Sequence, residues 1–177
     1  KQFDLLIFDW DGTLMDSAGV IVDSIQRACE DIGLPAPGDH ASRQIIGLGL
    51  IQALQALLWT RSQAALLNGD ADRIFVAGNS AGAHLAAMLM AVDWTRHGLA
   101  RSPIAGAILV TGIYDLRAVL HIQVNEDTRL APQEVAALSP QFLALHNPAD
   151  TIVAVGGDEP PLWIEQSWKP YCLSGVF

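Results

Sequence analysis

The segment Arg73-Ile74-Phe75-Val76-Ala77-Gly78-Asn79-Ser80-Ala81-Gly82 decides the fold of this chain. Its first half, Arg73 to Ala77, is apolar from Ile74 onward and typical of a buried strand, and turn-forming residues precede it. The stretch from Ala81 to Met90 is small and apolar on all sides, which predicts a buried helix. Glycine on both sides of Ser80 allows the chain to pass from strand to helix through a tight turn.

Two further apolar runs, Ile104–Val110 and Thr151–Val155, predict two more buried strands. A short helix is expected between them at Pro132–Ala137. Strands that alternate with helices in this order form a parallel sheet with right-handed crossovers. The sequence therefore predicts an α/β fold, in which a parallel sheet carries helices on both faces in a three-layer αβα arrangement.

The turn around Ser80 has the chemistry of a nucleophile elbow. A serine hydroxyl is a weak nucleophile unless a base takes its proton, and the Gly-X-Ser-X-Gly turn lifts it above the carboxyl edge of the sheet. The backbone amide of Ala81 is predicted to be one donor to the oxyanion. Asp158 follows the third predicted strand at the same edge, so we predict that it orients a catalytic histidine. Asp115 is the weaker candidate for this acid and is interpreted as a loop-capping residue.

Residues from about 57 to 168 resemble the middle of the α/β-hydrolase fold, and are most similar to arylformamidases (kynurenine formamidase-like) and hormone-sensitive-lipase-like esterases. The matching stretches, in the family's order, are Gly69–Leu85, Gly112–Leu116, Leu138–Pro140 and Val153–Glu159. The resemblance implies hydrolysis of a carboxylic ester or an N-formyl amide through an acyl-serine intermediate at Ser80. It implies no metal and no other cofactor.

The histidines depart from this family pattern. The family's catalytic histidine lies well beyond the acid, and no histidine follows Asp158 in this sequence. The five histidines are His40, His84, His97, His121 and His146. His84 lies on the predicted elbow helix and is interpreted as a packed helix residue, and the His-Gly-Gly oxyanion loop of the family is also absent. A serine hydrolase without its base keeps only the rate from binding and oxyanion contacts, so we expect impaired activity.

A second motif, Asp9-Trp10-Asp11-Gly12-Thr13, follows the strand predicted at Asp4–Phe8. Two carboxylates two residues apart can divide the roles of nucleophile and general acid, and Mg²⁺ beside them would neutralise an approaching phosphate. Residues 1 to about 57 resemble the start of haloacid-dehalogenase-like (HAD) phosphatases of the phosphoglycolate phosphatase type. The resemblance implies that Asp9 forms an aspartyl-phosphate, that Asp11 protonates the leaving group, and that both lie at the Mg²⁺ site.

The predicted helix from Ser17 to Ile32, with Gly33 as its C-cap, and the segment Ile46-Gly47-Leu48 resemble the opening of the HAD cap. Residues 1–57 are therefore predicted to be a HAD-like N-terminal segment, and residues 58–177 a partial α/β-hydrolase core. The later phosphatase motifs are missing, and a phosphatase without its charge-neutralising lysine should be nearly inactive. The alternatives are a serine esterase or arylformamidase, an Mg²⁺-dependent phosphatase, and a catalytically inert chimeric scaffold.

Composition narrows the class of partner. The 177 residues are 51% hydrophobic and 16% charged, which is typical of a folded α/β protein. A net charge of −9 argues against a nucleic-acid partner, because phosphate binding needs clustered lysine and arginine. No apolar run reaches the ~18 residues of a membrane span, so no membrane partner and a cytoplasmic location are expected. Cys29 and Cys172 are expected to be free thiols. The expected partner is a small ester, formamide or phosphate monoester.

Overall fold

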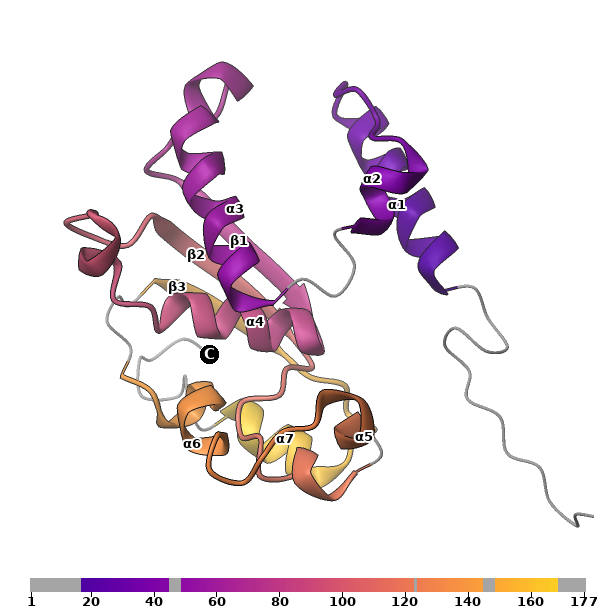
Figure 1. Ribbon diagram of the computed structural model, residues 1–177, viewed down its shortest axis with the longest axis vertical. Helices are drawn as coiled ribbons and strands as arrows, with labels where there is room; N and C mark the ends of the chain where they lie inside the picture. Colours follow the sequence, from indigo (N-terminus) through magenta and orange to yellow (C-terminus); the bar gives the residue numbers. More distant parts are fainter. Residues whose placement is uncertain (1–16, 45–48, 123, 145–148, 169–177) are drawn as a thin grey trace, which may run out of the picture. The chain divides into compact units, whose positions relative to one another are not determined.

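The computed structural model describes residues 17–44, 49–122, 124–144 and 149–168, and Figure 1 shows their helices and strands. The chain divides into two compact units, residues 1–48 and residues 49–177. Several sequence features lie outside the described residues, among them the strand predicted at Asp4–Phe8, the segment Ile46–Leu48, and Cys172. None of the helices in the described ranges has the length and apolar character needed to cross a membrane.

In the described part of the first unit, α1 (Ser17–Asp31) packs with α2 (Asp39–Gln44). Helix α1 matches the helix predicted from Ser17. It ends at Asp31, shortly before Gly33, which has a positive φ of 73°, and the Leu34 amide donates to the Cys29 carbonyl at 2.8 Å. This hydrogen-bond pattern is typical of a glycine C-cap, so the predicted end of the helix is confirmed.

The second unit is built around a parallel sheet of three strands, β1 (Ile74–Asn79), β2 (Ile104–Val110) and β3 (Asp150–Ala154), in the order β1-β2-β3. The register pairs Ala77 with Ile108 and Ile108 with Ile152. Strand β2 coincides with its predicted range, and β1 and β3 begin within one residue of theirs. The predicted parallel α/β fold is therefore confirmed.

Helices α3 (Leu50–Gln63) and α4 (Ala81–Met90) pack with the sheet into one core. Its fully buried residues include Ala83, Ala87, Trp94 and Leu109. Helix α4 has the bounds that its small, apolar sequence predicts, because it is buried beneath α3 and over β1 and β2. Leu57 of α3 belongs to the same core, and Leu50, Ala53, Leu54 and Leu58 are partly buried against it, whereas Ile51 and Trp59 are exposed.

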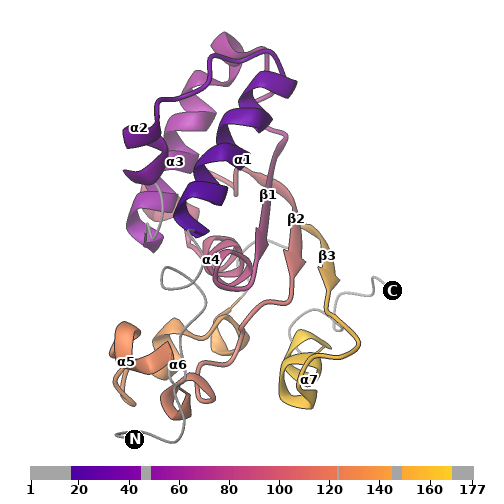
Figure 2. The ribbon, with the colours of Figure 1, turned by 90° about the vertical axis from the view of Figure 1, so that its right-hand side faces the viewer.

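The remaining elements lie near the carboxyl ends of the strands or connect the larger ones. Helices α5 (Val124–Thr128), α6 (Val135–Leu138) and α7 (Pro161–Trp168) lie beyond the carboxyl ends of the strands (Figure 2). Short 3₁₀ helices link the larger elements, and those in the described ranges are η1 (Ala64–Leu67), η2 (Trp94–His97), η3 (Val119–His121) and η4 (Pro140–Phe142). The helix predicted at Pro132–Ala137 corresponds to α6, which begins later.

The two faces of the sheet differ in burial. Helices α3 and α4 cover one face, while Phe75, Ile108 and Ile152 on the other face are 62%, 46% and 59% exposed. Successive strands move in one direction across the sheet, so right-handed crossovers place their connecting segments on one side. Helices on the second face, the third layer of the prediction, are not found among the described residues.

Candidate active site

Ser80 lies at the junction of β1 and α4 in a strained backbone conformation. Its φ of 54° and ψ of −117° lie outside the regions that residues with a side chain normally adopt. Its amide donates to the Val110 carbonyl of β2 at 2.9 Å, and its carbonyl accepts from the His84 amide at 3.1 Å. The side chain is exposed and does not cap the helix. The hydroxyl thus stands at the carboxyl edge of the sheet, as the elbow motif predicts.

The two glycines that flank Ser80 have different roles. A Cβ atom on Gly78 would overlap the backbone carbonyl of Gly82 and lie 2.6 Å from the Ala83 nitrogen, so no side chain fits there. A Cβ atom on Gly82 would meet no atom within 4 Å. Gly78 therefore lets the turn close, whereas Gly82 leaves open space beside the serine.

The first turn of α4 carries the candidate oxyanion donor. Ala81 is the first residue of the helix and is exposed. The first amides of a helix have no intrahelical acceptor, and the helix dipole favours negative charge at this end. The Ala81 amide can therefore donate to a negative oxygen that forms on a carbonyl attacked by Ser80.

Asp158 and Glu159 follow β3, at the same edge of the sheet as Ser80. Since β2 lies between β1 and β3, the ends of β1 and β3 are about two strand spacings apart, roughly 10 Å, and Asp158 lies four residues beyond the end of β3. Asp158 is exposed in a turn, whereas Glu159 is half-buried, with its Cγ atom against Gly156. The Glu159 amide donates to the Gly156 carbonyl at 3.2 Å. Glu159, which no sequence pattern singled out, is thus a second candidate for the acid.

His84 is held by the loop that follows β2. Its Nδ1 atom lies 2.8 Å from the Ile113 carbonyl oxygen, to which it donates. Burial lowers the pKa of His84, and the hydrogen bond to Ile113 opposes this shift in part. The ring is therefore neutral near pH 7 and ties α4 to the loop, in agreement with its interpretation as a packed helix residue. His97 lies beyond the other end of α4, and His146 lies outside the described residues.

Asp115 is engaged in local contacts. It is 9% exposed, and its Oδ1 atom accepts from the Arg117 amide at 3.0 Å and from Arg117 Nε at 2.9 Å. The Arg117 guanidinium also lies 5.2 Å from the centre of the Phe142 ring. These contacts agree with the interpretation of Asp115 as a loop-capping residue and disfavour a role as the triad acid.

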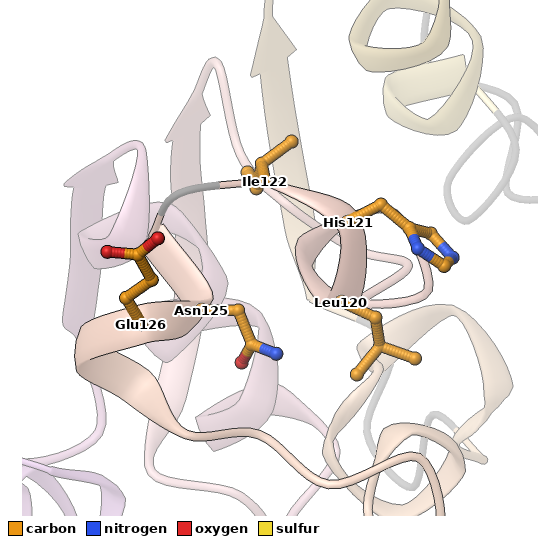
Figure 3. Close-up of a pocket in the computed structure, with 5 residues that line it drawn as sticks. All are labelled: Leu120, His121, Ile122, Asn125 and Glu126. Atoms are coloured by element: carbon orange, nitrogen blue, oxygen red, sulfur yellow. The ribbon is translucent and has the colours of Figure 1, made fainter.

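A pocket of about 500 Å³ lies beside η3 and α5, and its lining includes Leu120, His121, Asn125 and Glu126 (Figure 3). His121 and Glu126 point away from each other in this view. The Asn125 side chain already makes a local hydrogen bond, in which its Oδ1 atom accepts from the Leu130 amide at 2.8 Å. Neither Ser80 nor Asp158 lines this pocket, so it offers no chemistry that belongs to the elbow.

The predicted metal ligands, Asp9 and Asp11, lie outside the described residues. In the ranges that the structure does describe, no three His, Cys, Asp or Glu side chains form a group able to hold a metal ion. Cys29 is a free thiol, as expected.

The arrangement of a strained serine between a parallel strand and a helix agrees with the comparison to known families. Residues 44–162 match the family described as the alpha/beta hydrolase fold. The chain belongs to this family. The predicted resemblance of residues from about 57 to 168 to α/β-hydrolases is thus confirmed.

Individual relatives cover parts of the chain. Kynurenine formamidase from Salmo salar is 39% identical over 104 residues, which are 55% of this chain and 35% of that protein. Phosphoglycolate phosphatase from Photorhabdus laumondii is 38% identical over 77 residues, which are 42% of this chain and 33% of that protein. The chain therefore spans about a third of the length of these curated relatives.

Among solved structures, a lipase/esterase from Lactobacillus plantarum matches with a TM-score of 0.57 and 22% identity, over 73% of this chain and 54% of that chain. At this identity the similarity shows the fold alone. Together with the family match, it supports the α/β-hydrolase fold of this chain.

Proposed function

We propose that this chain hydrolyses small carboxylic esters or N-formyl amides through an acyl-serine intermediate at Ser80. The observation that carries the proposal is the strained conformation of Ser80, with φ 54°, between β1 and α4. Backbone strain of this kind persists where the surrounding structure enforces it, and it is concentrated at functional sites. The formamidase relatives support the N-formyl amide as one of the two substrate classes.

The proposed chemistry follows the geometry of the elbow. The Ser80 oxygen attacks the substrate carbonyl, and its proton passes to a base. The Ala81 amide donates to the oxyanion that forms on the carbonyl oxygen. The intermediate collapses when the leaving alcohol or amine takes the proton from the base, and water then releases the acid from Ser80. No metal takes part in this proposal.

Covalent labelling tests the role of Ser80. A fluorophosphonate probe should modify the full chain at Ser80, as located by peptide mass spectrometry, and Ser80→Ala should abolish the modification. Hydrolysis of p-nitrophenyl acetate and of N-formylaniline then distinguishes the two substrate classes. A probe that leaves Ser80 unmodified in folded protein contradicts the proposal and favours an inert scaffold.

We further propose that neither His84 nor His97, both among the described residues, serves Ser80 as its base, which leaves the activity impaired. His84 is held by Ile113, and His97 lies more than the length of α4 away from Ser80, roughly 15 Å. Added imidazole should therefore raise the rate of p-nitrophenyl acetate hydrolysis in a saturable manner. Ser80→Ala in the same imidazole gives the uncatalysed rate to be subtracted. A wild-type rate independent of imidazole, yet lost in Ser80→Ala, would show that a resident base exists.

The acid is proposed to be Asp158 or Glu159, because both follow β3 at the edge that carries Ser80. An acid orients the imidazole and stabilises its charged form, so its loss should weaken the imidazole response. Asp158→Asn and Glu159→Gln form a matched pair for this measurement. The half-buried Glu159 is expected to show the larger loss, since its side chain is held against Gly156 while Asp158 is exposed.

The second candidate function is an Mg²⁺-dependent phosphatase with Asp9 as nucleophile and Asp11 as general acid. Two observations favour it: the Asp9–Thr13 motif, and the similarity of part of the chain to phosphoglycolate phosphatase. On this proposal the chain joins a HAD-like segment to a partial α/β-hydrolase core. Beryllofluoride with Mg²⁺ should then form an adduct at Asp9 that Asp9→Asn prevents. Failure of the adduct to form in wild-type protein removes this candidate.

A further inference from the structure

The loop Thr111–Leu116, which follows β2, begins beside the candidate nucleophile. Val110, the last residue of β2, pairs with Asn79 and accepts a hydrogen bond from the Ser80 amide at 2.9 Å. The next residue, Thr111, donates its amide to the Ala154 carbonyl of β3 at 2.7 Å. The start of the loop is therefore tied to both neighbouring strands, one of which leads to Ser80 and the other to Asp158.

The backbone of this loop is strained. Thr111 is a β-branched residue with a positive φ of 45°. Gly112 has no room for a side chain, because a Cβ atom there would overlap the Tyr114 hydroxyl and lie 2.8 Å from Tyr114 Cε1. A strained conformation persists only when contacts around it hold it in place. The loop therefore depends on tethers supplied by other elements.

Gln166 of α7 supplies the most direct of these tethers. Its Oε1 atom accepts from the Tyr114 amide at 2.7 Å and from the Asp115 amide at 2.8 Å. The Gln166 side chain is 3% exposed, and Tyr114 and Asp115 are 0% and 9% exposed, so these bonds are shielded from water. One carbonyl oxygen has two lone pairs and satisfies both amides. The Gln166 Nε2 atom has no hydrogen-bond partner among the described residues, so the side chain holds the loop through its Oε1 atom.

Other elements hold the same loop. His84 of α4 donates to the Ile113 carbonyl at 2.8 Å, and the Ser139 hydroxyl accepts from the Leu116 amide at 2.9 Å. The loop is therefore hydrogen-bonded to residues of α4 and α7 as well as to β3. Helix α4 begins directly after Ser80, and α7 begins two residues after Glu159. The loop is thus the point where the elements that carry the candidate nucleophile and the candidate acid are joined.

We propose that Gln166 is a positioning residue, which fixes the Thr111–Leu116 loop and thereby sets the position of Ser80 relative to the Asp158–Glu159 segment. This proposal rests on the proposed acyl transfer at Ser80. Gln166 touches no reacting atom in this scheme. It acts through two backbone amides, and small displacements of a nucleophile are enough to lower its reactivity strongly.

Two substitutions separate the acceptor from the packing of the side chain. Gln166→Met keeps the length of the side chain and removes the acceptor, while Gln166→Glu keeps an oxygen that accepts from both amides. We expect the second-order rate of fluorophosphonate labelling at Ser80 to fall on the order of 10- to 100-fold in Gln166→Met. Gln166→Glu should restore the rate to within about threefold of wild type. Rates are expressed per folded molecule and measured from pH 6 to pH 9. If only the packing of the side chain mattered, both variants would lower the labelling rate equally.

Amide hydrogen exchange provides a readout that does not depend on the proposed chemistry. The Tyr114 and Asp115 amides should lose protection in Gln166→Met and keep it in Gln166→Glu, with Leu109 of β2 unchanged in both. If wild-type Ser80 is not labelled, the proposed function fails. If the Tyr114 and Asp115 amides keep their protection in Gln166→Met, the proposal that Gln166 holds the loop fails, whatever the labelling shows. If Ser80 is labelled at the wild-type rate in folded Gln166→Met, the positioning role is overturned while the proposed function stands.

A milder variant covers the case in which Gln166→Met does not fold. Ser139→Ala removes the hydroxyl that accepts from the Leu116 amide at the other end of the loop. The same mechanism predicts slower labelling and reduced protection of the Leu116 amide. Labelling at the wild-type rate in folded Ser139→Ala, with Leu116 exchanging faster, would overturn the link between the loop and Ser80.

Discussion

The elbow shows how a single missing Cβ atom can decide a local fold. Gly78 lies against the backbone of Gly82, so the turn closes only because residue 78 has no side chain. Gly82 is also two residues from Ser80 in sequence, but a Cβ atom there would meet no atom within 4 Å. The symmetric Gly-X-Ser-X-Gly pattern therefore contains two glycines with unequal structural demands.

These demands predict unequal effects of two single-methyl substitutions. Gly78→Ala forces the turn apart and should lower the free energy of unfolding by about 3 kcal/mol or more. Gly82→Ala lies in the first turn of α4 and should change it by less than about 1 kcal/mol, in the stabilising direction, because alanine favours helix. Urea denaturation followed by circular dichroism measures both values. Equal losses in the two variants would contradict the geometry of the turn.

His84 predicts a dependence of stability on pH. Burial lowers its pKa in the folded state relative to the usual 6.5 of the unfolded chain. As the pH falls below 6.5, the unfolded chain takes up a proton at this site before the folded protein does, so stability is lost. Above 6.5 the ring is neutral in both states and the effect vanishes.

We therefore expect His84→Asn to lose less stability than wild type between pH 7.5 and pH 5, because asparagine does not titrate. Thermal denaturation at a series of pH values measures this difference in slope. His121→Asn is the matched control, since the His121 side chain is exposed. A wild-type slope in His84→Asn would show that other groups cause the acid destabilisation.

At the scale of the elements, the two faces of β2 offer a comparison of neighbouring residues. Leu109 is fully buried under α4, whereas Ile108 lies on the opposite face and is 46% exposed. Leu109→Ala should lower the free energy of unfolding by about 2–5 kcal/mol. Ile108→Ala should cost less than half as much, because roughly half of its side chain already contacts water. Urea denaturation of both variants checks this, and equal costs would indicate a helix layer over the Ile108 face.

Sequence patterns predicted the elements that depend on local composition. Helix α4 and β2 were predicted with their observed bounds, because continuous apolar runs and the tight turn at Ser80 leave few alternatives. Helix α7 was missed, since Pro160 precedes it, Pro161 is its first residue, and its polar residues show no clear period.

The candidate site was predicted where it depends on a local motif and missed where it depends on distant contacts. Ser80 and Ala81 follow from the turn itself. Gln166 bonds to amides more than 50 residues away, and no local pattern indicates such a contact. Asp158 and Glu159 differ as candidates for the acid because Asp158 is exposed and Glu159 is half-buried. The sequence of two adjacent acidic residues does not indicate which of them is buried. Asp9 and Asp11 lie outside the described residues, so their roles stay predictions.

At the scale of the whole molecule, the hydrophobic core belongs to one unit. Every residue of the core cluster, from Leu50 in α3 to Val153 in β3, lies in residues 49–177. The α/β-hydrolase match covers nearly the same part of the chain, residues 44–162. The energy of burial that holds the elbow in place therefore comes from this unit, since buried apolar area is the main source of folding free energy.

Removal of residues 1–48 should consequently leave the elbow intact. We expect residues 49–177 to unfold cooperatively, with a melting temperature within about 5 °C of the full chain, which corresponds to roughly 1 kcal/mol. Fluorophosphonate labelling of Ser80 should proceed at the rate of the full chain, while any Mg²⁺-dependent phosphatase activity at Asp9 is lost with the deleted residues. Calorimetry and labelling of both proteins make the comparison. A fragment that lacks a cooperative transition would contradict this prediction. It would mean that residues 49–177 need residues 1–48 for stability, although they contain the whole core cluster.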